Sequence, residues 1–143
     1  MKKLLIAFAI MSVVAAGAEL KDGRYSVKTD KSIWFWYPKT EIVVKDGQVV
    51  EATHDRVKKD GRLASQDDWY NKKMLKKTGS NPEQYSKEIP ENYFKANKNL
   101  DEIDNVAGAT ESVVHFKKQM NFLLKKAETG ETGEFLMPKK DLK

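Results

Sequence analysis

The sequence predicts an α+β fold in which an antiparallel sheet from the N-terminal half packs against helices of the C-terminal half. Two observations predict it. Strand patterns joined by short turns occupy residues 24–63, and helical patterns that include a long apolar stripe occupy residues 65–129. The 143 residues suit a single domain, and 40% hydrophobic with 33% charged residues is an ordinary globular composition.

The first eighteen residues have the pattern of a signal peptide. Lys2-Lys3 precede the apolar run Leu4–Ala16, and Ala16-Gly17-Ala18 matches a small-residue cleavage site. A membrane anchor is the alternative, but the run is shorter than the roughly 20 apolar residues that span a bilayer. We therefore expect cleavage after residue 18, no stable transmembrane anchor in the mature chain, and export to the periplasm or the extracellular space.

The first half of the mature chain contains the predicted strands. Residues 24–29 alternate in polarity, and the aromatic run Ile33–Tyr37 has high strand propensity up to Pro38. Strand-like segments flank Asp46-Gly47, a dipeptide that favours the positive φ angles of a type I′ hairpin turn. Asp60-Gly61 predicts a second turn. Consecutive strands with short connections indicate antiparallel pairing.

The second half contains the predicted helices. Ser65–Asp68 resembles a capping box that opens a helix ended by Gly79. Asn81-Pro82 starts a second helix, in which we expect Pro90 to be a break. A third helix precedes residues 130–143, which show no periodicity and are expected to form a loose tail. The apolar stripe of this third helix consists of Val113, Phe116, Met120, Leu123 and Leu124.

Composition excludes several classes of function. The sequence has no cysteine and two histidines, so it offers no thiolate nucleophile, no disulfide, no cysteine for a lipid anchor and no multi-histidine metal site. The net charge falls from +5 to +3 when Lys2 and Lys3 are removed, and the remaining lysines alternate with acids, so we expect no nucleic-acid partner. His54 and His115 are expected on the surface. We identify no catalytic residue and expect no metal.

The segment Asp104–Ser112, just before the third helix, is the strongest candidate for a ligand site. Its small side chains let a ligand approach the backbone. The helix that follows directs free N–H groups and the positive end of its dipole toward this segment, which suits a phosphate group. The alternative is that Thr110 or Ser112 only caps the helix.

This segment resembles the motif Asp-x-x-Ser/Thr-Gly-Ala-Thr of the FMN-binding domain family. That domain occurs in the C and G subunits of sodium-pumping (Nqr) and Rnf redox complexes and in extracytoplasmic electron-transfer flavoproteins of bacteria. In that family a flavin transferase joins the phosphate of FMN to the final threonine. By resemblance this residue is Thr110, with Asp104, Gly108 and Ala109 at the other motif positions. Ala107 stands where the family has serine or threonine.

The resemblance continues outside the motif. The matching residues are Asp22–Tyr25, Val43–Val50, Lys59–Asp67 with Tyr70, Asn71 and Met74, and Phe116, so the resemblance covers about residues 20–127 in order. It implies one FMN-binding domain over residues 19–129. Because Ala107 lacks a hydroxyl, non-covalent FMN or attachment at Ser112 are alternatives to a phosphodiester at the motif threonine.

Four aromatic residues are candidates for stacking on the flavin ring: Trp34, Trp36, Trp69 and Tyr70. Alternation along a strand would place either Trp34 and Trp36 or Phe35 and Tyr37 outside the sheet, and the alternative role for the run is core packing.

The resemblance implies an electron carrier of the bacterial envelope rather than an enzyme. Its cofactor would be FMN, and a flavin transferase would complete its maturation. Its redox partners would be proteins or a quinone-linked membrane complex. The alternatives are a non-redox envelope or surface protein that uses the fold without covalent flavin, and a flavin reductase of an exported acceptor.

Overall fold

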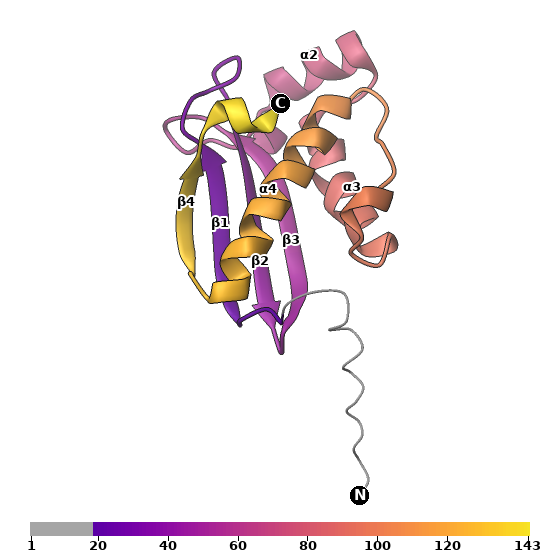
Figure 1. Ribbon diagram of the computed structural model, residues 1–143. Helices are drawn as coiled ribbons and strands as arrows, with labels where there is room; N and C mark the ends of the chain where they lie inside the picture. The colour runs from indigo at the N-terminus through magenta and orange to yellow at the C-terminus, as the bar shows by residue number, and fades with distance from the viewer. Residues whose placement is uncertain (1–18) are drawn as a thin grey trace, which may run out of the picture.

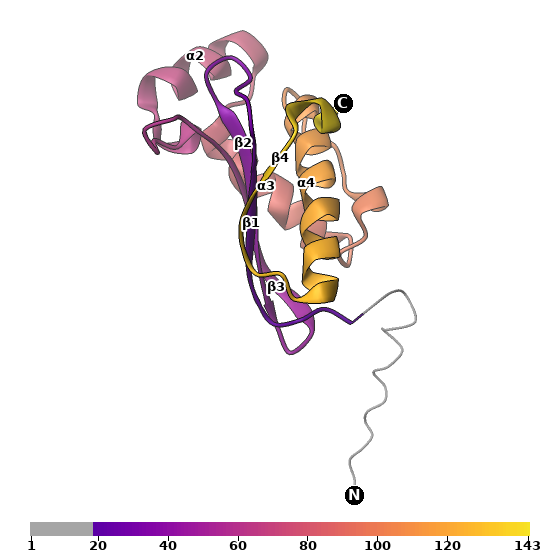
Figure 2. The same ribbon diagram turned by 60° about the vertical axis from the view of Figure 1, so that its left-hand side comes forward.

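The computed structural model describes residues 19–143, so the predicted signal peptide lies outside the described residues. Within them, four strands form one sheet in the order β3-β2-β1-β4, and the helices follow mainly in the C-terminal half (Figure 1). Helix α4 lies along one face of the sheet, as the turned view shows (Figure 2). The predicted α+β class is confirmed.

Strands β1 (Gly23–Thr29), β2 (Tyr37–Lys45) and β3 (Gln48–Val57) pair antiparallel in chain order. Asp46 and Gly47 have φ angles of 53° and 76°, so the predicted type I′ turn between β2 and β3 is confirmed. Alternate residues of these strands point toward the helices and are fully buried, among them Tyr25, Val27 and Ile42.

The C-terminal segment is not the loose tail that the sequence suggests. Strand β4 (Gly133–Met137) pairs with β1 in parallel, which makes the sheet mixed. The backbone N–H of Asp30 donates to Met137 at 3.0 Å, and Leu142 is buried in the short 3-10 helix η4 (Lys139–Leu142). A five-residue strand is too short to show a clear period. Its partner β1 lies at the other end of the described chain, so the pairing leaves no local pattern.

The aromatic run is also corrected, because it forms a tight turn instead of a strand. Ile33 and Trp36 exchange two backbone hydrogen bonds of 2.7 and 3.1 Å. Between them Trp34 and Phe35 have φ angles of 52° and 77°, and their side chains are 82% and 78% exposed. Such angles cost about 1–2 kcal/mol for each residue with a Cβ atom. The buried Trp36, which packs on Tyr70, holds the turn in place.

The helical segments of the described chain are η2 (Ala64–Gln66), α2 (Asp68–Thr78), α3 (Pro82–Lys95), η3 (Leu100–Glu102) and α4 (Thr110–Thr129). Gly79 and Gly130 end α2 and α4 in the left-handed conformation, as glycine after a helix commonly does. Asp67, not Ser65, caps α2. Pro90 lies inside α3 without breaking it, because the helix buries Ile89 and Tyr93 against the core.

The predicted stripe of α4 forms the centre of the core. Val113, Phe116, Met120 and Leu123 are buried, and Leu124 is half-buried. This packing against β1 and β2 brings the N-terminal end of α4 to the end of the sheet where α2 and the Trp34-Phe35 turn lie (Figure 1).

Candidate ligand-binding pocket

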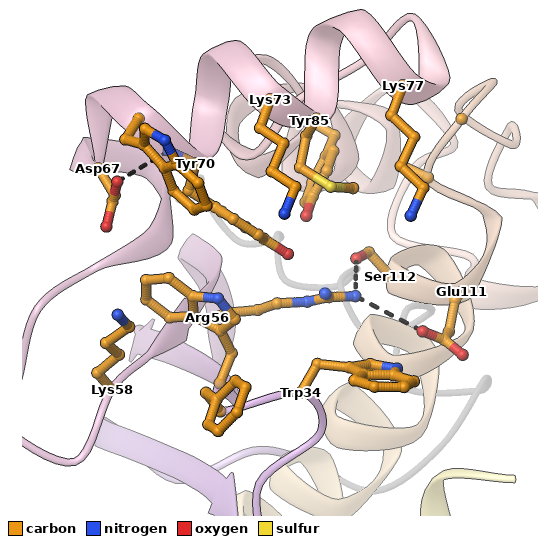
Figure 3. Close-up of a pocket in the computed structure, with 16 residues that line it drawn as sticks. Trp34, Arg56, Lys58, Asp67, Tyr70, Lys73, Lys77, Tyr85, Glu111 and Ser112 are labelled. Carbon is orange, nitrogen blue, oxygen red and sulfur yellow. Dashed lines mark hydrogen bonds and ion pairs between the residues drawn. The ribbon is translucent and has the colours of Figure 1, made fainter.

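A cavity of about 530 Å³ lies where five segments meet (Figure 3). The segments are the Trp34-Phe35 turn, the end of β3, helix α2 with its N-cap, Tyr85 of α3, and the start of α4. They are distant in sequence, so the cavity exists only after the sheet and helices have packed.

The cavity unites two groups of predicted residues. All four aromatic candidates line it: Trp34, Trp36, Trp69 and Tyr70. Three residues of the predicted phosphate segment also line it, namely Gly108, Ala109 and Ser112. Asp104, Ala107 and Thr110 lie outside the lining, and the exposed hydroxyl of Thr110 accepts a hydrogen bond from Asn105 Nδ2 at 3.1 Å.

The aromatic side chains form a wall with cations against it. The rings of Trp36 and Tyr70 lie 5.1 Å apart and tilted by 36°. The Nζ atom of Lys58 lies 4.9 Å from the centre of the Trp36 ring, and that of Lys73 lies 4.8 Å from the Trp69 ring. Exposed faces of Trp34 and Trp69 remain at the mouth. Such a wall suits a planar aromatic ligand that carries negative charge.

Helix α2 is held against the cavity by a buried amide. The side chain of Asn71 donates to the carbonyls of Ala64 and Asp67 at 2.9 and 2.8 Å, and its oxygen accepts from the backbone of Glu83 at 2.8 Å. Asp55 of β3 accepts hydrogen bonds from the backbone and hydroxyl of Ser65, which explains why Ser65 does not cap α2. These contacts fix the aromatic wall relative to β3.

The start of α4 faces the cavity without a capping side chain. Its N-cap is Ala109, so neither Thr110 nor Ser112 has the capping role that was the alternative interpretation. Gly108 has φ 80°, and a Cβ atom there would lie 2.9 Å from the carbonyl oxygen of Thr78. Only glycine fits this close approach, and the first-turn N–H groups of α4 are left for water or a ligand.

Arg56 was not among the predicted site residues, and its side chain extends across the cavity (Figure 3). The residue is 8% exposed, and its Nη2 donates to Ser112 Oγ at 3.0 Å. Glu111 Oε1 lies 3.8 Å from the same nitrogen. The alternation of Ala52, His54 and Arg56 with polar neighbours continues the β3 pattern and could have indicated that Arg56 faces inward.

Both histidines are buried, which corrects the expectation that they lie on the surface. Thr40 Oγ1 donates to Gln119 Oε1 at 2.7 Å, so it accepts its 2.8 Å hydrogen bond from His54 Nδ1. Burial, with the charge of Arg56 next, lowers the pKa of His54 to about 3 and that of His115 to about 4. Both rings are therefore neutral at neutral pH, beside a permanent charge.

Among residues 19–143, no group of three or more acidic, histidine or cysteine side chains is arranged to hold a metal ion. No helix in the same range combines the length and apolar character needed to cross a membrane.

No family model matches the chain. The chain is 31% identical over 96 residues to a Treponema pallidum (strain Nichols) protein named 15 kDa lipoprotein, and the match covers 67% of each chain. Its structure is similar to the crystal structure of the CPE2226 protein from Clostridium perfringens, a structural-genomics target. That similarity has 32% identity and a TM-score of 0.76, over 83% of this chain and 98% of the other.

Proposed function

The chain belongs to the family of the 15 kDa lipoprotein of Treponema pallidum. We propose that it is an exported envelope protein that binds FMN and carries electrons; the family membership supports the envelope part of this proposal, and the pocket supports the flavin part. The signal-like residues 1–18 and the printed name of this relative both support export. The proposal places the mature chain in the periplasm or outside the cell.

One observation carries the flavin proposal: a single cavity joins the four aromatic candidates to the uncapped start of α4. A volume of about 530 Å³ lies within the usual range of small-molecule sites. The aromatic wall suits the isoalloxazine ring, and the N–H groups of α4 with the cations around them suit the phosphate. Bound FMN would supply the one- and two-electron chemistry, while this chain binds it and keeps the ring accessible at the open mouth.

Thr110 is the proposed covalent attachment point, as the resemblance to the FMN-binding domain motif implies. Its hydroxyl oxygen would bond to the phosphorus of the FMN half of FAD while the pyrophosphate bond breaks. AMP leaves, the hydroxyl proton is released, and no electrons are exchanged. Thr110 is the first residue of α4 and is exposed, so a flavin transferase has access to it. Ser112 is the alternative acceptor, but its hydroxyl is buried and bonded to Arg56.

The intact mass of the mature protein tests the attachment. Wild type and the variants Thr110→Ala and Ser112→Ala are exported together with a flavin transferase. We expect wild type to gain the mass of FMN less one water, Ser112→Ala to keep the gain, and Thr110→Ala to lose it. A gain that survives Thr110→Ala would move the attachment elsewhere.

Ala107 favours a second candidate, a non-redox envelope protein without covalent flavin, because its methyl group replaces the motif hydroxyl. Colour separates the two candidates. A colourless wild-type protein that has no mass gain and takes up no added FMN would contradict the electron carrier and support this alternative.

A further inference from the structure

Arg56 is a buried charge without a carboxylate at hydrogen-bond distance. Its side chain is 10% exposed, its one hydrogen bond through Nη2 goes to the Ser112 hydroxyl, and Glu111 at 3.8 Å is itself 68% exposed. The Nε atom is buried and has no hydrogen-bond partner among residues 19–143. A buried guanidinium is strongly unfavourable unless an anion and further acceptors compensate for its lost hydration.

The other two arginines of the described chain show the opposite arrangement. Arg24 is 66% exposed and lies 2.9 Å from Glu41, while Arg62 is 62% exposed and lies 3.0 Å from Asp60. The arginines that need a carboxylate least are thus paired with one. Arg56, which needs an anion most, has a hydroxyl at hydrogen-bond distance and a largely hydrated carboxylate at 3.8 Å.

The groups around Arg56 do not neutralise it. His54 and His115 are kept uncharged by burial, and burial raises the pKa of Tyr85 against the lowering effect of Arg56. Lys58, Lys73 and Lys77 line the same cavity and add positive charge. Two acids line it as well, Glu111 and Asp67, and Asp67 Oδ1 is occupied by the Tyr70 N–H at 2.9 Å.

We propose that Arg56, Ser112 and the uncapped first turn of α4 form an anion site that holds the phosphate group of the ligand by charge. The guanidinium supplies fork-like donors, and the uncapped start of α4 adds N–H groups. The site therefore selects phosphate-bearing aromatic ligands, and it does so without a covalent bond to Thr110.

This inference rests on the proposed function, because it takes the cavity as the ligand site. It adds that the cavity recognises the phosphate group of the ligand. The test compares FMN with riboflavin, which has the same ring and lacks the phosphate. Both are titrated into flavin-free mature protein, purified without a flavin transferase, and followed by quenching of flavin fluorescence. We expect FMN to bind about tenfold or more tightly than riboflavin. Added inorganic phosphate should compete with FMN and have little effect on riboflavin.

Variants assign the preference to Arg56. Arg56→Gln should bind both flavins with equal affinity, while Arg62→Gln, which loses the same charge at an exposed ion pair, should retain the preference. Arg56→Lys should fold with its charge in place and keep part of the preference. Glu111→Gln should strengthen FMN binding several-fold, because it removes the nearest carboxylate. Weaker FMN binding by Glu111→Gln, with its folding verified by circular dichroism, would contradict the anion site.

A second measurement separates this inference from the flavin proposal. Phosphate should raise the melting temperature of wild type and of Arg62→Gln above that in chloride of equal ionic strength, and should not do so for Arg56→Gln. That result without binding of either flavin would contradict the flavin proposal and support the anion site. Equal affinity of wild type for FMN and riboflavin would overturn the anion site and leave flavin binding intact. Absence of any phosphate effect together with absence of flavin binding would overturn both.

Discussion

The buried face of helix α4 differs in polarity between the two halves of the helix. In the C-terminal half this face consists of apolar residues, Met120, Leu123 and Ala127, all with no measurable exposure. In the N-terminal half the same face includes Ser112, His115 and Gln119, also buried. Three of the buried polar atoms without a partner in the described chain are His54 Nε2, Arg56 Nε and His115 Nδ1, beside this N-terminal half. Apolar packing therefore continues along the whole helix through Val113 and Phe116, whereas the buried polar groups suited to a ligand are confined to its N-terminal half.

The largest expected effect comes from the apolar half. Leu123→Ala should lower the free energy of unfolding by about 3 kcal/mol, because it leaves a cavity in a fully buried position. FMN affinity should not change, since Leu123 lies outside the pocket lining. Urea denaturation and flavin titration measure the two quantities. A large loss of affinity in the folded variant would show that the two halves are coupled.

A fall in pH should destabilise the protein through the buried histidines beside the N-terminal half of α4. The pKa of His54 is lowered from 6.5 to about 3 in the folded protein, so the unfolded chain binds the extra proton between these values. The contribution of the neutral ring to stability is complete above pH 6.5 and declines as pH falls toward 3. Between pH 6.5 and 5 the loss for His54 is about 2 kcal/mol, and His115 acts in the same direction.

Urea denaturation at several pH values between 7 and 4.5 checks this expectation. His54→Gln should be less stable than wild type at pH 7, because it disturbs the hydrogen bond to Thr40, yet its stability should fall less steeply with acid. An equal slope in wild type and variant would assign the acid sensitivity to other groups.

The smallest effect concerns the Trp34-Phe35 turn at the mouth of the pocket. Phe35 has φ 77°, so Phe35→Gly should relieve backbone strain and stabilise the protein by about 1 kcal/mol. The same change should weaken FMN binding, because Phe35 lines the cavity. Melting temperature and flavin titration test both effects. A variant that loses stability would indicate that the Phe35 ring contributes more to packing than its exposure implies.

Sequence reasoning could find much of the site but not its centre. The aromatic candidates and Gly108, Ala109 and Ser112 were predicted from three separate segments, and residues of all three line the cavity. Arg56 was not predicted, because a lone arginine after a hairpin resembles a surface residue. Its alternation with Ala52 and His54 along β3 indicates the inward face, but its burial depends on α4, which is distant in the sequence.

The sequence by itself determined the features that depend on near neighbours. The Asp46-Gly47 turn, the ends of α2 and α4 at Gly79 and Gly130, and the apolar stripe of α4 all follow from local φ preferences and side-chain periodicity. Only the tertiary structure decided the parallel pairing of β4 with β1, the Trp34-Phe35 turn and the burial of Arg56. In each of these three cases, contacts between segments that are distant in sequence outweigh the local conformational preference. The free energy gained by packing those segments exceeds the cost of backbone strain or of burying a charge.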